Sequence, residues 1–201
     1  LASIPSVGKM IRKWDTSVFV VFLAGLGIAV SIAFLTPASE SNNPIYLGLC
    51  GVVAICSMII PGLSGSFVLL LMGNYELIML DSLSALFGGD LKTALSVLIP
   101  VGIGAVVGLL VLSRFLSWLF RAHHDNAVGA ITGFVVGSLV IIWPWKETVY
   151  HDEMKEKIIG FKNWTFPDLM LGSTWLQVGA VAIGIGLIVI IDRIAHKNKA
   201  V

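Results

Sequence analysis

Five residues in one short stretch have the types and spacing to bind a ligand. The stretch runs from Ile59 to Glu76 and reads "IIPGLSGSFVLLLMGNYE". Its middle combines helix-breaking residues with hydroxyl groups, namely Pro61, Gly62, Ser64, Gly65 and Ser66. The proline lacks a backbone N–H group, and the glycines allow backbone angles and close approaches that other residues do not. We therefore expect a broken helix at this point, with polar groups that a ligand can reach.

The residues after the break predict a helix start that suits an anion. Ser66 is a suitable N-cap for a helix over Phe67–Leu80. The first N–H groups of such a helix have no partner within it, and its dipole is positive at this end. Both properties favour a bound phosphate or carboxylate. The alternative is a proline–glycine kink that only packs against neighbouring helices.

Two charged residues outside the break are further candidates for binding. Glu76 could relay protons or pair with a cation, or it could be a solvated acid at the membrane surface. Arg114, followed on the same segment by Arg121, could contact a lipid phosphate at the inner face of the membrane. The alternative is that both arginines only fix the orientation of the chain in the membrane.

The segment Arg121–Asn126, "RAHHDN", contains two histidines and an aspartate but no recognisable metal or catalytic motif. The spacing of His123 and His124 is not that of a helical HxxxH or HExxH site. We expect a turn between helices, capped by Asp125 or Asn126, with no metal and no other cofactor. The chain also lacks a glycine-rich phosphate loop, a nucleophile elbow and a dinucleotide motif, so the sequence supports neither an enzyme nor binding of nucleic acid.

The composition places these residues in a membrane protein. Of the 201 residues, 57% are hydrophobic and 12% are charged, whereas a soluble domain carries about 25% charged residues. The apolar residues form long uninterrupted blocks, which predicts an all-α, polytopic bundle of transmembrane helices in a single domain. Four blocks have about the length of a membrane span: Ser17–Leu35, Ala94–Leu112, Ala127–Ile142 and Thr174–Ile191.

Lysine and arginine residues set the expected orientation, because basic loops stay on the cytoplasmic side. Three short basic segments are expected there: Lys9–Lys13, Arg114–Arg121 and Arg193–Lys199. Both termini are then cytoplasmic, and the block Ile45–Leu80 begins and ends outside. Its arms, Ile45–Ile60 and Phe67–Leu80, would be about 24 and 21 Å long, too short to cross a hydrocarbon layer of about 30 Å. We therefore expect a re-entrant hairpin whose tip is "PGLSGS".

Small residues recur at every fourth position in three of the expected helices. Such stripes let two helices approach each other closely. The three stripes are Gly104 with Gly108, Gly129 with Gly133 and Gly137, and Ala180 with Gly184. We expect them to serve packing and not chemistry.

Four segments of the chain, in order, resemble the signatures of one family of bacterial membrane proteins. They read "PGLSGSFVLLLMGNYE", "SRFLSWLF", "HHDNAVGAITGFVVGSL" and "WPWK". The family is that of the polyprenyl-phosphate transporters (PopT), long called domain of unknown function 368. Its members have two PG-x-SG segments, one in each of two inverted repeats, whereas this chain has one. The resemblance therefore suggests that a first repeat is absent here. Many members also look basic just before "WPWK", where this chain has Val140, Ile141 and Ile142. The resemblance therefore does not support a contact with a lipid headgroup at that position.

The resemblance implies a function for the broken tip. Family members are thought to return undecaprenyl phosphate, the carrier lipid of cell-wall assembly, from the outer to the inner leaflet of the bacterial cell membrane. On this view the glycines and serines of "PGLSGS" bind the phosphate transiently, a second repeat completes the site, and Glu76 is the candidate for coupling to protons or sodium. An ion or small-anion channel or carrier is one alternative, and a lipid-phosphate enzyme using His123, His124 and Asp125 is another. The coupling ion, a homo-oligomeric state and the direction of transport stay open.

Overall fold

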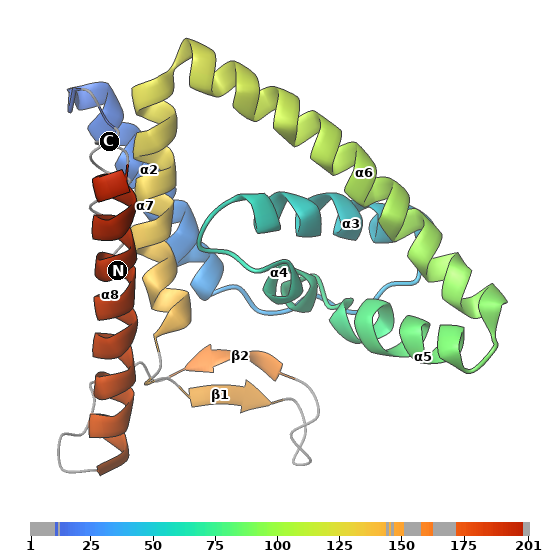
Figure 1. Ribbon diagram of the computed structural model, residues 1–201. Coiled ribbons are helices and arrows are strands. Elements are labelled where there is room, and N and C mark those ends of the chain that lie inside the picture. Colours follow the sequence, from blue (N-terminus) through green and yellow to red (C-terminus); the bar gives the residue numbers. More distant parts are fainter. Residues whose placement is uncertain are drawn as a thin grey trace.

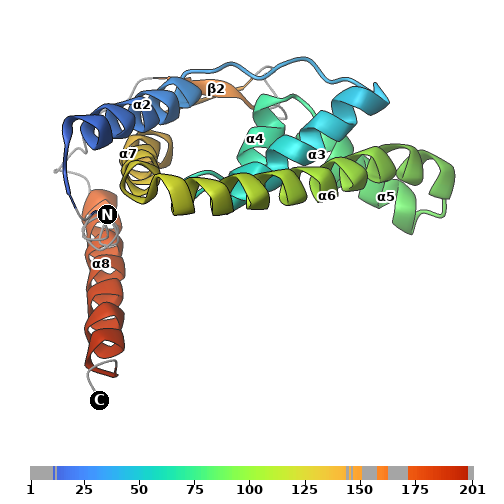
Figure 2. The ribbon, with the colours of Figure 1, turned by 90° about the horizontal axis from the view of Figure 1, so that it is seen from above.

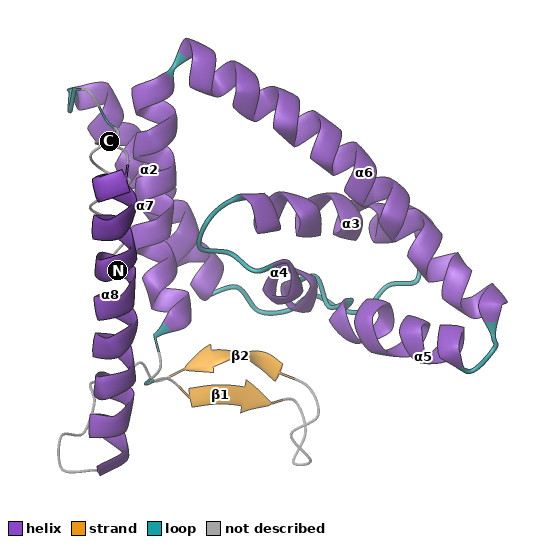
Figure 3. Cartoon of the chain, viewed as in Figure 1, coloured by secondary structure: helices purple, strands orange, loops and turns teal. Residues whose placement is uncertain are grey.

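The computed structural model describes residues 11, 13–143, 145, 147–150, 158–162 and 172–198. It is almost entirely helical (Figures 1 and 3). The helices are α2 (Thr16–Ala33), α3 (Pro44–Ile59), α4 (Gly65–Leu71), the π-helical turn η1 (Leu77–Asp81), α5 (Ser82–Phe87), α6 (Leu91–Ala122), α7 (His124–Ile142) and α8 (Gly172–Asn198). Two short strands, β1 (Glu147–Tyr150) and β2 (Ile158–Lys162), pair as an antiparallel hairpin that the sequence did not predict.

The expected spans are found as helices, and the all-α membrane fold is confirmed. Within the described residues, α2, α6 and the segment His124–Ile141 of α7 are long and apolar enough to cross a membrane. The apolar part of α8, Trp175–Ile191, is slightly shorter. Of the basic residues used to predict the orientation, Lys9, Arg12 and Lys199 lie outside the described residues.

Side chains that precede the helices fix where three of them begin. Asp15 accepts a hydrogen bond from the N–H of Val18 at the start of α2. Asn43 accepts one from Ile45 at the start of α3, where Pro44 occupies the first helical position. Asp90 accepts hydrogen bonds from the hydroxyl and the N–H of Thr93 at the start of α6, and these bonds lower the pKa of its carboxyl group.

The glycine stripe of α7 packs directly against α2. A Cβ atom added to Gly133 would collide with the carbonyl oxygen of Phe22, and one added to Gly137 would lie 2.5 Å from that of Leu26. On the α2 side, Gly25 meets the backbone of Ala130 in the same way. The expected close packing of this stripe is therefore confirmed, and it makes α2 and α7 one tightly joined pair.

A second pair is formed by α3 and α6, which run in the same direction. Gly48 lies against Gly104, and farther along both helices Val52 lies against Gly108. Figures 1 and 2 show the two helices side by side, with α5 leading back to the start of α6. The segment 44–87 therefore begins beside the N-terminal part of α6, runs along that helix, and returns to its N-terminal end. The core of this segment is formed by the buried residues Leu47, Cys50, Leu69 and Ile78, together with Val97 of α6.

The expected single helix over Phe67–Leu80 is wrong. Helix α4 ends at Leu71, and the chain turns through Gly73, whose φ angle of 73° is rarely adopted by other residues. The loop between α2 and α3 stabilises this turn, because the N–H of Ala38 donates a hydrogen bond to the carbonyl oxygen of Leu71. Helical structure resumes only at Tyr75 and Glu76, directly before η1.

Helix α8 stands apart from the two pairs. Figure 2 shows it extending away from the layer that the other helices form. A Cβ atom added to Gly184 would have no described atom within 4 Å. The expected close crossing at Ala180 and Gly184 thus has no partner among the described residues.

Candidate functional site

The expected break in the hairpin is present between α3 and α4. Helix α3 ends at Ile59, and Gly62 adopts a φ angle of 99°. The tip packs against α7 at this point, since a Cβ atom on Gly62 would lie 2.5 Å from Oγ of Ser138. Both the backbone angle and the contact require glycine here. Pro61 beside it is exposed.

Helix α4 begins two residues earlier than expected, so Ser66 as the N-cap is wrong. Ser64 is the N-cap, with an extended backbone and a carbonyl oxygen that accepts the first helical hydrogen bond, from Val68. Its hydroxyl does not cap the helix but lies 2.7 Å from that of Ser66, with which it shares a hydrogen bond. The earlier start is possible because Gly65 fits closely against Met58 and Ala54 of α3.

A pocket of about 490 Å³ opens at this break. Ser64, Gly65 and Ser66 line one part of it, and the rest is apolar, from Ala54, Met58, Leu63, Leu69 and Met79. Three of the five expected tip residues therefore share one pocket, while Pro61 and Gly62 do not line it. Sequence reasoning missed Met58 of α3 and Met79 of η1. Met79 reaches the pocket only because the chain makes the unexpected turn at Gly73.

The two charged candidates lie elsewhere. Glu76 precedes η1, is partly buried and does not line the pocket. Arg114 is exposed on α6 and lines a separate hollow with Ser113, Ser117 and Arg121. The structure therefore places the predicted ligand-binding residues in more than one location.

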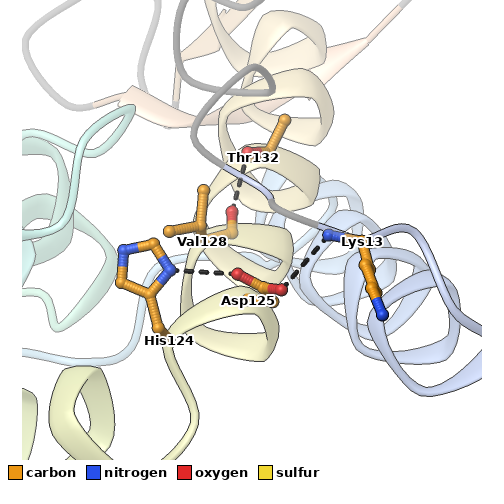
Figure 4. A network of polar contacts seen from close by, with 5 residues as sticks. All are labelled: Lys13, His124, Asp125, Val128 and Thr132. Carbon is orange, nitrogen blue, oxygen red and sulfur yellow. Dashed lines mark hydrogen bonds and ion pairs between the residues drawn. The ribbon is translucent and has the colours of Figure 1, made fainter.

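The histidine segment joins α7 to the start of α2. Nδ1 of His124 lies 3.0 Å from Oδ1 of Asp125, whose Oδ2 accepts a hydrogen bond from the backbone N–H of Lys13 (Figure 4). Next to it, Asn126 and Ser17 are hydrogen-bonded through their side chains. Asp125 and Asn126 thus hold α7 against the start of α2 instead of capping α7. Among the residues that the structure describes, no group of three or more His, Cys, Asp and Glu side chains could hold a metal ion.

Sequence comparison relates the chain to known transport proteins. It is 37% identical over 150 residues to a polyprenyl-phosphate transporter of Vibrio cholerae, a match that covers 74% of this chain and 46% of the relative. It is 29% identical over 144 residues to a polyprenyl-phosphate transporter of Staphylococcus aureus, a match that covers 66% of this chain and 49% of the relative. The chain thus spans about half the length of the curated relatives it matches. No solved structure matches it.

A family profile gives the same assignment over most of the chain. Residues 1–158 match the family described as undecaprenyl phosphate translocase-like. The matched region includes both glycine-packed helix pairs and the pocket at the tip. The chain therefore belongs to the undecaprenyl phosphate translocase-like family.

Proposed function

We propose that the protein takes part in moving undecaprenyl phosphate from the outer to the inner leaflet of the bacterial cell membrane, so that the carrier lipid is reused in cell-wall biogenesis. Membership of the family and the names of the two relatives support this proposal. The observation that carries it is the pocket at the break between α3 and α4, where two hydroxyl groups meet an apolar wall. Such a pocket is matched to a polar phosphate on a hydrocarbon tail.

The path of the chain supports a re-entrant hairpin. Helix α3 runs alongside α6, and α4, η1 and α5 return to the end of α6 from which α3 started. With 16 residues, α3 is about 24 Å long, less than the roughly 30 Å of hydrocarbon in a bilayer. In this proposal the hairpin enters and leaves on the outer face, both termini are cytoplasmic, and the tip lies at membrane depth. Irregular backbone at that depth is tolerated where it is buried in protein or lines a wet cavity.

The chemistry of the tip suits transient binding. The hydroxyl groups of Ser64 and Ser66 can donate hydrogen bonds to phosphate oxygens when they separate from each other. Met58, Leu69 and Met79 offer an apolar surface to the first part of the tail. We place no chemical step at the histidine segment, since the carboxylate of Asp125 is already hydrogen-bonded to the backbone N–H of Lys13 and to Nδ1 of His124. Glu76 remains our candidate for coupling to protons or sodium.

The test reconstitutes the full-length protein in liposomes with radiolabelled undecaprenyl phosphate. A phosphatase that cannot cross the bilayer is then added outside. Without transport it releases about half of the phosphate, and with transport it releases nearly all. The double variant Gly65→Leu and Ser66→Ala should return release to about half, because leucine fills the pocket and a hydroxyl is lost.

The matched control is Ser96→Ala, which removes an exposed hydroxyl from α6, remote in sequence from the tip. It should leave release complete. Complete release by the tip variant would refute the assigned role of the tip. Ion flux through the protein, measured in liposomes that contain no undecaprenyl phosphate, would instead favour an ion or small-anion carrier.

A further inference from the structure

The second half of α6 carries a hollow that the proposed tip site does not use. It has a volume of about 450 Å³ and is lined by Ser113, Arg114, Ser117 and Arg121. All four residues are exposed. Arg114, Ser117 and Arg121 are three and four residues apart, so they share one face of the helix. Two guanidinium groups and two hydroxyl groups therefore gather along about 12 Å of one helix.

The same face continues as a row of exposed apolar side chains. Ile103, Val107 and Leu110 precede Arg114 at the same helical spacing and are 61%, 48% and 58% exposed. The row extends over about 16 Å from Ile103 to Arg114. Helix α3 does not cover it, because α3 packs on the separate face that contains Gly104 and Gly108.

Aromatic residues place the hollow at the membrane surface. Phe115 and Trp118 are both more than half exposed and flank Arg114 and Ser117 along the helix. Aromatic side chains of this kind are enriched where the hydrocarbon layer meets water. The arginines then lie at the level of lipid headgroups, and the row Ile103–Leu110 lies in the hydrocarbon layer.

The chemistry of the hollow matches a phosphate monoester. A guanidinium group offers a planar fork of N–H donors that fits two phosphate oxygens. A monoester carries between one and two negative charges near neutral pH, which two arginines can balance. The hydroxyl of Ser117 can donate a further hydrogen bond, whereas that of Ser113 donates to the carbonyl oxygen of Leu110 at 3.1 Å and would have to leave it first.

We propose that this face of α6 is a second binding site for an isoprenoid lipid phosphate. The phosphate lies between Arg114 and Arg121, and the isoprenoid tail lies along Ile103, Val107 and Leu110. The inference rests on the proposed function for the identity of the lipid. It adds a site at the cytoplasmic end of α6, where the headgroup binds after it has left the tip.

The test maps the site with farnesyl phosphate that carries a photoreactive diazirine on its tail. The purified protein is irradiated in detergent, and labelled residues are identified by mass spectrometry. Label is expected between Ile103 and Leu110. Arg114→Gln should reduce this label about tenfold at subsaturating ligand, the size of effect expected for a lost charge-assisted hydrogen bond. The double variant with Arg121→Gln should reduce it further.

The chain offers a matched control at the other end of the same helix. Lys92 is also exposed, and Lys92→Gln removes one positive charge without touching the hollow. It should leave the label unchanged. Competition identifies the ligand class: unlabelled farnesyl phosphate should displace the label, whereas farnesol, inorganic phosphate and phosphatidylglycerol should compete at least tenfold less well.

Several results would overturn the inference. Undiminished label in the double variant would show that the arginines do not bind the ligand. Equal competition by phosphatidylglycerol would indicate a general site for anionic lipid, and equal competition by inorganic phosphate would indicate a site without a tail. Because the label reports its position, absence of label on α6 together with lost transport in the tip variants refutes only this second site, whereas normal label on α6 together with full transport in the tip variants refutes only the tip.

Discussion

The hairpin between α2 and α6 is broken twice, once at each end of α4, and the two breaks differ in how their polar groups are satisfied. The first break lies between Ile59 and Gly65, and the second lies between Leu71 and Tyr75. Each contains a glycine with a positive φ angle, Gly62 in the first and Gly73 in the second. By backbone geometry alone they look like the same feature.

The second break is closed by protein. Asn74 is completely buried, its Nδ2 donates to the carbonyl oxygen of Ser41 at 2.8 Å, and its Oδ1 accepts from the N–H of Ser41 at 3.0 Å. The hydroxyl of Tyr46 donates to the carbonyl oxygen of Met72 at 2.8 Å. Neighbouring side chains and the loop before α3 therefore satisfy the backbone that the helix leaves open.

The first break is open to a pocket instead. Its two hydroxyls, on Ser64 and Ser66, are exposed and share one hydrogen bond with each other. Both can turn to a ligand at little cost to the fold. The comparison teaches that a broken helix in a membrane is not in itself a site, because the second break is a structural turn. The functional distinction lies in which polar groups remain available.

The largest effect on stability is expected from Asn74→Ala in the closed break. The substitution leaves the N–H and the carbonyl group of Ser41 without the amide that pairs with both. An unsatisfied group costs about 1–3 kcal/mol when it is buried, and Ser41 is partly buried, so we expect a loss of about 2–4 kcal/mol in the free energy of unfolding. Unfolding by SDS in mixed micelles measures this value.

Ser41→Ala is the control for that substitution. Ser41 bonds to Asn74 only through its backbone, so removing its hydroxyl keeps the pair. The hydroxyl accepts a long hydrogen bond from the N–H of Asn43 at an exposed position, where water can replace it. The control should change the unfolding free energy by less than about 0.5 kcal/mol. Equal losses in the two variants would show that the amide does not close the break.

A smaller loss is expected from Gly62→Ala in the open break. Alanine at a φ angle of 99° is strained, and its Cβ would lie 2.5 Å from Oγ of Ser138. Together these effects predict a loss of about 1–3 kcal/mol in the free energy of unfolding. Adding Ser138→Ala removes the closest atom and should restore part of the loss, which a double-mutant cycle measures. Strictly additive effects would contradict the contact between the tip and α7.

Sequence patterns predicted the elements that depend on local order along the chain. The apolar blocks located α2, α6, α7 and α8, and proline with two glycines located the first break. The stripes of α6 and α7 also predicted which faces pack, because a helix surface without side chains lets a neighbour approach closely, whereas the stripe of α8 meets no described neighbour.

What sequence patterns missed depends on contacts between distant segments. The second break needs Asn74 to meet Ser41, and no local signal indicates that pairing across the whole of α3. The loss of a straight second arm then moves Met79 into the tip pocket. The start of α4 was misplaced for a related reason, since it depends on the close fit of Gly65 against Met58 and Ala54 of α3.

The smallest effect on stability, and the sharpest contrast with Asn74, is expected from Ser64→Ala. The side chain is exposed and does not cap α4, so the free energy of unfolding should change by no more than about 0.5 kcal/mol. Release of phosphate in the liposome assay should nevertheless fall, because the pocket loses one of its two hydroxyl groups. Ser84→Ala, which removes an exposed hydroxyl from α5, should change neither quantity. If Ser64→Ala instead lowered stability as much as Asn74→Ala and left transport intact, both breaks would be structural turns, and the binding of phosphate would have to be sought elsewhere, first on the exposed face of α6.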